Sequence, residues 1–289
     1  MFKSKMVVML GVLAVSPVAS ADLSTGLMGH WSFDDCSAKD TSGHGRDGII
    51  NSNPECVDGA VGKAFNFLGA MDENVEVDNF PEIKKSLTVS GWVNPNKFPF
   101  TYNPIVTRGR TSEAYTLWVG YNNLTLLLNW NSSGEVWCST PIKIKNDDFS
   151  HVAATYNYNQ GKISLYLNGK RVGGCDYQSE LYSQTEPLYF SSSYPGAQEY
   201  FKGIIDEVRI YNRALSSAEV QTLYYRDKPP IIKGTASWIT PHTVTCENTT
   251  QSATVTIPET KSSVWDCEKS GLSVQSGDKV RVTIEGTKY

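Results

Sequence analysis

Short runs of alternating apolar and polar residues recur along most of this 289-residue chain. Roughly a dozen such runs, spaced by about 8–15 residues, are separated by the turn-forming residues Gly, Asn and Pro. The clearest hairpin spans 162–172, where two runs flank Asn168 and Gly169, a pair that tolerates the positive φ angles of a type I′ turn. The pattern predicts an all-β fold, an antiparallel β-sandwich of the jelly-roll type.

The run over 203–211 breaks the alternation expected of a strand. Ile205 is out of phase with Val208, and the acidic pair Asp206 and Glu207 sits at the break. We interpret this run as the closing core strand, which presents its carboxylates where the period of two is interrupted.

A helix signal follows this run directly. Ser216 and Glu219 have the spacing of a capping box, and Leu215 and Val220 flank them as a hydrophobic staple. The motif predicts one short helix of about two turns that ends near Tyr225.

The first 21 residues have the three parts of a secretory signal. Two lysines precede an apolar core over 6–15, and Ala19, Ser20 and Ala21 form a small–x–small cleavage pattern. The alternative is a membrane anchor, but an apolar core of about ten residues is too short to cross a bilayer. We expect a cleaved leader, no membrane span, and a mature protein that is secreted or lies in the periplasm or at the cell surface.

The rest of the chain divides at a proline-rich segment. We expect a jelly-roll domain over 22–226, a linker over 227–230 with two adjacent prolines, and a small β domain over 231–289. A unit of about 60 residues has a marginal core and gains from a covalent crosslink.

All six cysteines follow the leader, and an even number in an exported chain indicates disulfides. No Cys-x-x-Cys pair occurs, so zinc binding is poorly supported. Pairing between neighbours in the sequence is our hypothesis among the possible connectivities: Cys36–Cys56, Cys138–Cys175 and Cys246–Cys267.

The charge of the chain argues against nucleic acid as a partner. The formal net charge is −4, and loss of the leader with its two lysines leaves −6 (−4 − 2). A modestly acidic surface repels phosphate backbones and makes cation sites feasible instead.

Four ordered stretches resemble the bacterial laminin-G-like, concanavalin A-like jelly-roll domains, and the resemblance extends over 27–225. They are 30–34 (HWSFD), 40–48 (DTSGHGRDG), 57–67 (VDGAVGKAFNF) with 74–77 (NVEV), and 203–216 (GIIDEVRIYNRALS). The resemblance implies the jelly-roll fold, which hosts lectins, adhesion modules, pentraxin-like binders and glycosidases.

The resemblance also implies a calcium site, because family members often carry this ion and their first and last strands lie side by side. That arrangement would bring Asp34, Asp40 and Asp47 near Asp206, and Ca²⁺ favours carboxylates together with loop carbonyls. The alternative is that Asp40 and Asp47 form Asx-turns and that Asp206 makes a surface ion pair.

Exposed aromatic side chains in loops are candidates for stacking on sugar rings. Trp31, Trp92 and Trp118 lie on alternating strands, so we expect them in the core instead. The candidate ligand-binding residues are Phe100, Tyr102, Tyr121 and Tyr194.

The sequence lacks the motifs of catalysis on this fold. The Glu-x-Asp-x-x-Glu string of the jelly-roll glucanases is missing, as is a Gly-x-Ser-x-Gly elbow. We therefore expect a non-catalytic module that binds an extracellular polysaccharide. The alternative is an adhesion or structural module that binds a cell-surface protein, and a glycoside hydrolase is a third hypothesis.

Overall fold

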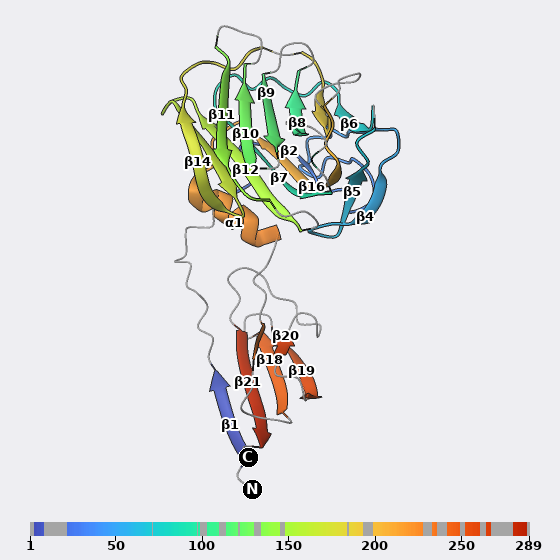
Figure 1. Ribbon diagram of the computed structural model, residues 1–289, viewed down its shortest axis with the longest axis vertical. Coiled ribbons are helices and arrows are strands. Elements are labelled where there is room, and N and C mark those ends of the chain that lie inside the picture. The colour runs from blue at the N-terminus through green and yellow to red at the C-terminus, as the bar shows by residue number, and fades with distance from the viewer. Residues whose placement is uncertain are drawn as a thin grey trace. The chain divides into compact units, whose positions relative to one another are not determined.

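Two antiparallel sheets pack face to face in the larger unit of the chain, residues 22–224 (Figure 1). The second unit combines residues 1–21 with 225–289. The computed structural model describes residues 3–8, 22–70, 72–96, 98, 103–109, 114–120, 122–129, 134–144, 148–183, 185–192, 199–227, 233–235, 242–248, 252–260, 264–266 and 280–287.

The first sheet has seven strands, and its lateral edges are β11 and β3. Its order is β11 (Val136–Pro141), β10 (Asn123–Leu128), β9 (Tyr115–Val119), β8 (Asn103–Arg108), β15 (Leu188–Phe190), β6 (Asn74–Val77) and β3 (Ile49–Asn51).

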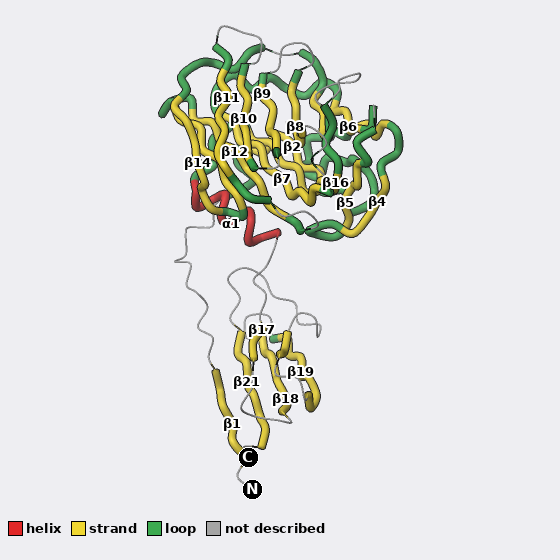
Figure 2. The backbone as a smooth tube through the Cα atoms, viewed as in Figure 1, coloured by secondary structure: helices red, strands yellow, loops and turns green. Residues whose placement is uncertain are grey.

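The second sheet has eight strands, and its lateral edges are β14 and β4. Its order is β14 (Lys170–Asp176), β13 (Lys162–Leu167), β12 (Ser150–Asn157), β7 (Leu87–Pro95), β16 (Gly203–Tyr211), β5 (Lys63–Phe67) and β4 (Glu55–Asp58), and β2 (Leu27–Trp31) pairs with β16. Together the two sheets confirm the predicted sandwich (Figure 2).

Apolar side chains from both sheets form one core between them. Trp31 of β2 packs against Phe190 of the opposite sheet, with ring centroids 4.9 Å apart. Trp92 and Trp118 are also buried, as the alternation predicts. Such aromatic contacts across the interface stabilise the face-to-face packing beyond the area that they bury.

The helix α1 (Ser217–Asp227) covers the outer face of the eight-stranded sheet. Val220 and Leu223 pack against Ala153 and Tyr166, and the ring of Tyr224 stacks on Trp92 at 5.5 Å. The central strands β7 and β16 are consequently buried on both faces.

The predicted helix signals are confirmed. The backbone N–H of Ser216 donates to Glu219 Oε2, and the backbone N–H of Glu219 donates to Ser216 Oγ, which is the reciprocal pattern of a capping box. The helix ends at Asp227, two residues beyond the expected end. In the hairpin, Asn168 and Gly169 both have positive φ, at 50° and 74°, as a type I′ turn requires.

Two prolines lie within strands, although proline has no N–H to donate to a ladder. Strand β7 continues to Pro95, and β8 begins at Asn103 and contains Pro104. The pairing of β8 with β9 is irregular between Pro104 and Val106, and a bulge tolerates a residue that has no N–H to donate.

Two of the predicted disulfides are confirmed, and each is at a lateral edge of the sandwich. Cys138–Cys175 joins β11 of one sheet to β14 of the other, and Cys36–Cys56 joins the loop after β2 to β4. Cys246 is also disulfide-bonded, whereas its predicted partner Cys267 lies outside the described residues.

The second unit is built from short antiparallel sheets. One has the order β1 (Lys3–Val8), β21 (Val280–Thr287), β18 (His242–Asn248) and β19 (Ala253–Thr260), and β17 (Lys233–Thr235) pairs with β20 (Val264–Asp266). β1 lies within the predicted leader, whose cleavage stays a prediction, and residues 9–21 and 228–230 are outside the described part of the chain. Within the described residues, no helix has the length and hydrophobicity needed to cross a membrane.

Candidate functional site

Strand β16 changes its neighbour where its alternation breaks. Residues 203–205 pair with β5, and residues 208–211 pair with β2, while β7 lies along the other side. The register against β7 shifts between Asp206 and Arg209, and Glu207 has a positive φ of 53°. A β-bulge therefore underlies the irregular sequence pattern, and the first and last strands of the sandwich lie side by side as expected.

The bulge turns Asp206 toward the turn between β4 and β5. Its Oδ2 accepts a hydrogen bond of 3.0 Å from the backbone N–H of Val61. Its Oδ1 is buried and has no hydrogen-bond partner among the described residues. Burial, opposed by backbone hydrogen bonds and assisted by the charges of Glu207 and Asp34, raises the pKa of Asp206 to about 8.

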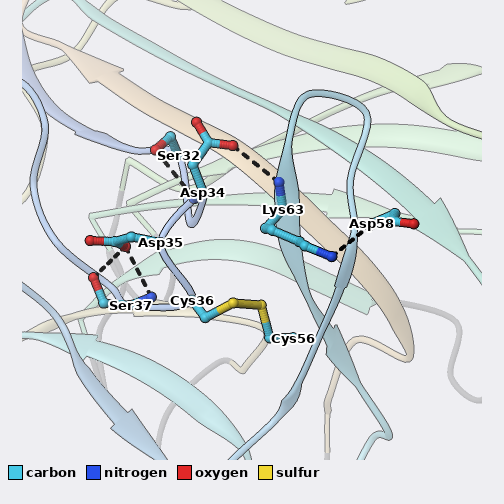
Figure 3. The surroundings of a disulfide bond; sticks show 8 residues. All are labelled: Ser32, Asp34, Asp35, Cys36, Ser37, Cys56, Asp58 and Lys63. Atoms are coloured by element: carbon cyan, nitrogen blue, oxygen red, sulfur yellow. Dashed lines mark hydrogen bonds and ion pairs between the residues drawn. A yellow bond between two sulfur atoms is a disulfide. The ribbon is translucent and has the colours of Figure 1, made fainter.

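Asp34 approaches the same turn from the loop after β2. Its Oδ1 accepts a hydrogen bond of 3.0 Å from the backbone N–H of Lys63, as Figure 3 shows beside the Cys36–Cys56 disulfide. A Cβ atom on Gly62 would lie 1.9 Å from this oxygen, so the approach requires glycine there. The carboxylates of Asp34 and Asp206 thus share one turn.

Asp40 and Asp47 belong to a different network, in the loop between β2 and β3. Asp40 accepts hydrogen bonds from the backbone N–H groups of His30, Ser42 and Arg46, and Asp47 Oδ1 accepts one from the backbone N–H of Asp40. Burial raises the pKa of Asp40, but hydrogen bonds from the side chain and backbone of Ser42, and from the backbone of Arg46 and His30, outweigh it and the net shift is downward. Among the described residues, no group of three His, Cys, Asp or Glu side chains could hold a metal ion, so the expected set of four aspartates divides into two pairs.

Glu207 is held by charged and polar neighbours on the other side of the bulge. His30 Nε2 lies 2.8 Å from Glu207 Oε2, and the buried Arg209 guanidinium donates to the same oxygen. Thr41 Oγ1 lies 2.9 Å from the other ring nitrogen of His30. The arrangement ties β2, β16 and the 41–47 loop together.

A pocket of about 580 Å³ lies at the edge of the sandwich where the Cys138–Cys175 disulfide joins the two sheets. One wall follows β10 and precedes β11, and the other is the segment after β14. The residues that line it are Asn129, Gly134, Glu135, Tyr177, Gln178, Ser179, Glu180 and Tyr182.

The buried side chain of Asn129 connects the two walls. Its amide Nδ2 donates to Tyr177 Oη at 2.8 Å and to the carbonyl of Glu180 at 2.7 Å, and its Oδ1 accepts from the backbone N–H of Tyr182 at 2.6 Å. Tyr177 Oη in turn donates to the carbonyl of Gly134 at 2.6 Å. These bonds hold both walls in a single arrangement.

Two exposed aromatic rings accompany this pocket. Tyr182 lines it and is 48% exposed. Trp137 is 40% exposed, packs against Trp118 with ring centroids 5.0 Å apart, and donates from Nε1 to Glu135 of the pocket. A large exposed ring beside polar groups is the arrangement that recognises sugars, since a pyranose has an apolar face and a polar rim.

The predicted ligand-binding residues Phe100, Tyr102, Tyr121 and Tyr194 lie outside the described residues. The interpretation of the sequence did not select Tyr177, Tyr182 or Asn129. A usable signal did exist, because the predicted Cys138–Cys175 pair places Trp137 and Tyr177 near each other.

Comparison with known proteins identifies relatives of this fold. A family model described as "Concanavalin A-like lectin/glucanases superfamily" matches residues 69–221. A search of curated protein sequences finds no match.

Solved structures with the same fold include a domain of a bacterial enzyme and parts of two toxins. One is domain 4 of AbnA, a GH43 extracellular arabinanase from Geobacillus stearothermophilus, whose structure was determined in complex with arabinotriose. It has a TM-score of 0.58 at 22% identity, and the match covers 68% of this chain and 98% of the arabinanase domain. The binding domain of Paraclostridial Mosquitocidal Protein 1 has a TM-score of 0.60 at 15% identity, and the match covers 80% of this chain and 63% of that domain. The binding domain of Botulinum Neurotoxin DC in complex with SialylT has a TM-score of 0.58 at 13% identity, and the match covers 83% of this chain and 63% of that domain.

These likenesses establish a shared fold. The chain spans 98% of the arabinanase domain but less than two thirds of the toxin domains that it matches. At such low identity the ligands in those structures belong to those proteins alone.

Proposed function

This chain belongs to the concanavalin A-like lectin/glucanase superfamily, and from that premise we propose that it is an exported, non-catalytic module that binds an extracellular glycan. The observation that carries the proposal is the pocket at the Cys138–Cys175 edge, with Tyr182 as its exposed ring. The arabinotriose and SialylT complexes of its structural neighbours give the proposal its chemical class.

The pocket suits a sugar for three physical reasons. Its volume of about 580 Å³ is within the range of small-molecule sites. An exposed tyrosine ring offers apolar contact to one face of a sugar. The carboxylates and amides of Glu135, Gln178 and Glu180 offer acceptors and donors to its hydroxyl groups.

A glycan array probed with the disulfide-intact protein tests this function, with Tyr182→Ala beside the wild type and Leu68→Ala as the control at an exposed apolar residue outside the pocket. We expect wild-type retention on at least one polysaccharide, release by the free oligosaccharide, and a loss of about tenfold or more for Tyr182→Ala only. The absence of any glycan binding would contradict the proposal and favour the alternative of an adhesion module that binds a cell-surface protein.

Glycoside hydrolysis is the second candidate, because Glu135 and Glu180 place two carboxylates in one pocket. Both residues are exposed to solvent, whereas a general acid is usually shielded from it to keep its proton. Incubation of each bound polysaccharide with the protein, followed by an assay of reducing ends, distinguishes the two functions. Production of reducing ends that is lost in Glu135→Gln would favour the hydrolase.

We also propose that the Asp34–Asp206 turn holds a structural calcium ion. The buried Oδ1 of Asp206, without a hydrogen-bond partner among the described residues, suits a hard cation, and the exposed Asp34 supplies a second carboxylate. Oxygens of the turn backbone and water would complete the coordination. This is a narrower donor set than the four aspartates expected from the sequence.

Calcium removal tests this site. We expect EDTA to lower the melting temperature and added Ca²⁺ to restore it, because a ligand that binds only the native state stabilises that state. Asp206→Asn should abolish the calcium-dependent shift, and Asp47→Asn should keep it. An unchanged melting temperature in calcium-stripped wild-type protein would refute the proposal.

A further inference from the structure

We infer that the pocket at the Cys138–Cys175 edge binds neutral sugars and rejects sugars that carry a carboxylate or a sulfate. This inference rests on the proposed glycan-binding function and names the charge class of its ligand.

Negative charge is concentrated on both walls. Glu135 lies on the wall before β11, and Glu180 lies on the wall after β14, and both are exposed. No lysine or arginine is among the described residues that line the pocket. An anionic sugar would therefore meet two carboxylates, and no described lining residue is a lysine or arginine that could compensate their charge.

The backbone carbonyls of the pocket are engaged within its walls, since that of Gly134 accepts from Tyr177 and that of Glu180 accepts from Asn129 and Ser179. A hydroxyl group of a ligand can donate to the carboxylates of Glu135 and Glu180. A carboxylate or sulfate cannot, because it has only acceptor atoms at neutral pH.

The pocket has little freedom to avoid this mismatch. Asn129 has a positive φ of 54° and bonds both walls, and the Cys138–Cys175 disulfide fixes the strands beneath them. Tyr156 strengthens the second wall, since its Oη donates to the carbonyl of Ser179 at 2.5 Å and Leu181 is buried next to it. Negatively charged acceptors held in fixed positions favour neutral ligands over anionic ones.

The experiment compares neutral polymers with uronate polymers of the same sugar series: a galactan with polygalacturonate, and a mannan with polymannuronate. Binding is measured by affinity electrophoresis and calorimetry with the disulfide-intact protein at low and high salt. We expect measurable binding to a neutral member and at least about tenfold weaker binding to its uronate partner, with the ratio smaller at high salt because ions screen the repulsion.

Isosteric variants locate the discrimination. Glu180→Gln and Glu135→Gln keep the shape of the side chain and remove its charge, and we expect each to reduce the ratio of neutral to uronate affinity. Glu55→Gln removes the same charge from β4 at the opposite edge and should leave the ratio unchanged.

The outcomes separate this inference from the proposed function. Equal or tighter binding of uronates, or an unchanged ratio in the Glu180→Gln and Glu135→Gln variants, would overturn the inference and leave glycan binding intact. Neutral binding that survives Tyr182→Ala would place the glycan elsewhere and would also overturn it. Failure of every polymer on the array would instead overturn the proposed function.

Discussion

Asp206 has a carboxylate in the interior of the sandwich with one oxygen bonded to the 59–63 turn and the other without a partner among the described residues. Its pKa rises from an ordinary value of 3.8 to about 8 because burial penalises the charged form. The native protein without metal therefore keeps a proton on this residue in a range of pH where the unfolded chain has lost it.

The proton on Asp206 gives a pH dependence with a definite sign. Its contribution to the free energy of unfolding is fully present below pH 4 and is lost as the pH rises toward 8, because over that interval the folded state binds more protons than the unfolded state. In EDTA, the melting temperature of the wild type should fall relative to that of Asp206→Asn between pH 5 and pH 8. Thermal unfolding at several pH values measures this difference, and parallel curves would contradict the assigned protonation.

Asn129 should matter for both pocket and stability. Asn129→Ala and Asn129→Gly each remove the amide that bonds Tyr177, Glu180 and Tyr182, and we expect each to lower the affinity for the glycan. The partner groups that are left without a hydrogen bond should lower the free energy of unfolding by about 1–3 kcal/mol. Glycine accepts the positive φ of 54°, so Asn129→Gly should be about 1 kcal/mol more stable than Asn129→Ala in urea denaturation. Equal stability of the two would show that the backbone geometry carries no cost.

At the scale of residues, the sequence predicts features that depend on neighbours along the chain. The broken alternation at Asp206 and Glu207 corresponds to the bulge, and Ser216 and Glu219 form the expected cap. The placement of Asp40 and Asp47 away from Asp206 could not be predicted, because it depends on which loop hydrogen bonds form after the first and last strands pair.

At the scale of elements, the Cys138–Cys175 bond joins edge strands of opposite sheets next to the pocket. Thr140 Oγ1 of β11 also donates to the carbonyl of Val172 in β14, at 3.2 Å. The distance between the two sheets at this edge is thus set by a covalent bond and by a direct polar contact.

Loss of this disulfide should affect stability and binding together. The double variant Cys138→Ser/Cys175→Ser opens a loop with a sequence separation of 37, and we expect the free energy of unfolding to fall by about 2–4 kcal/mol. Affinity for the glycan should fall as well, because the walls are no longer tied. Urea denaturation and calorimetry measure the two effects.

The double variant Cys36→Ser/Cys56→Ser is the matched control for that experiment. It removes a bond near the Asp34 turn and should lower stability while the affinity for the glycan stays within about twofold of the wild type. Equal losses of affinity in the two variants would show that binding depends on the global stability of the sandwich and not on the Cys138–Cys175 disulfide beside the pocket.

Strands with clear alternation could be predicted, and strands without it could not. β13 and β14 flank the turn of the predicted 162–172 hairpin, whereas β4 (Glu55–Asp58) offers one apolar residue besides its cysteine and shows no such alternation. The pocket escaped prediction for a similar reason. Its walls are loop segments separated by about fifty residues, as the contact of Asn129 with Glu180 illustrates, and only the closure of the sandwich brings them together.

At the scale of the whole molecule, all residues of the pocket and of the Asp34–Asp206 turn belong to the unit over 22–224. We expect residues 22–227, produced alone under oxidising conditions, to bind the glycan with the affinity of the full chain and to keep the calcium-dependent shift in melting temperature. Calorimetry on the two proteins checks this. A large loss of affinity in the shorter protein would show that the second unit contributes to binding.

The lateral edges of the sandwich have a consequence for self-association. A long exposed edge strand can pair with strands of another molecule and start aggregation. Here the edge strands β3 and β4 have only three and four residues, and the longer β11 and β14 are crosslinked to each other and carry the exposed Lys170 and Arg171 at the start of β14. The oxidised sandwich should therefore stay monodisperse at high concentration, while reduction frees the longer edges for pairing between molecules.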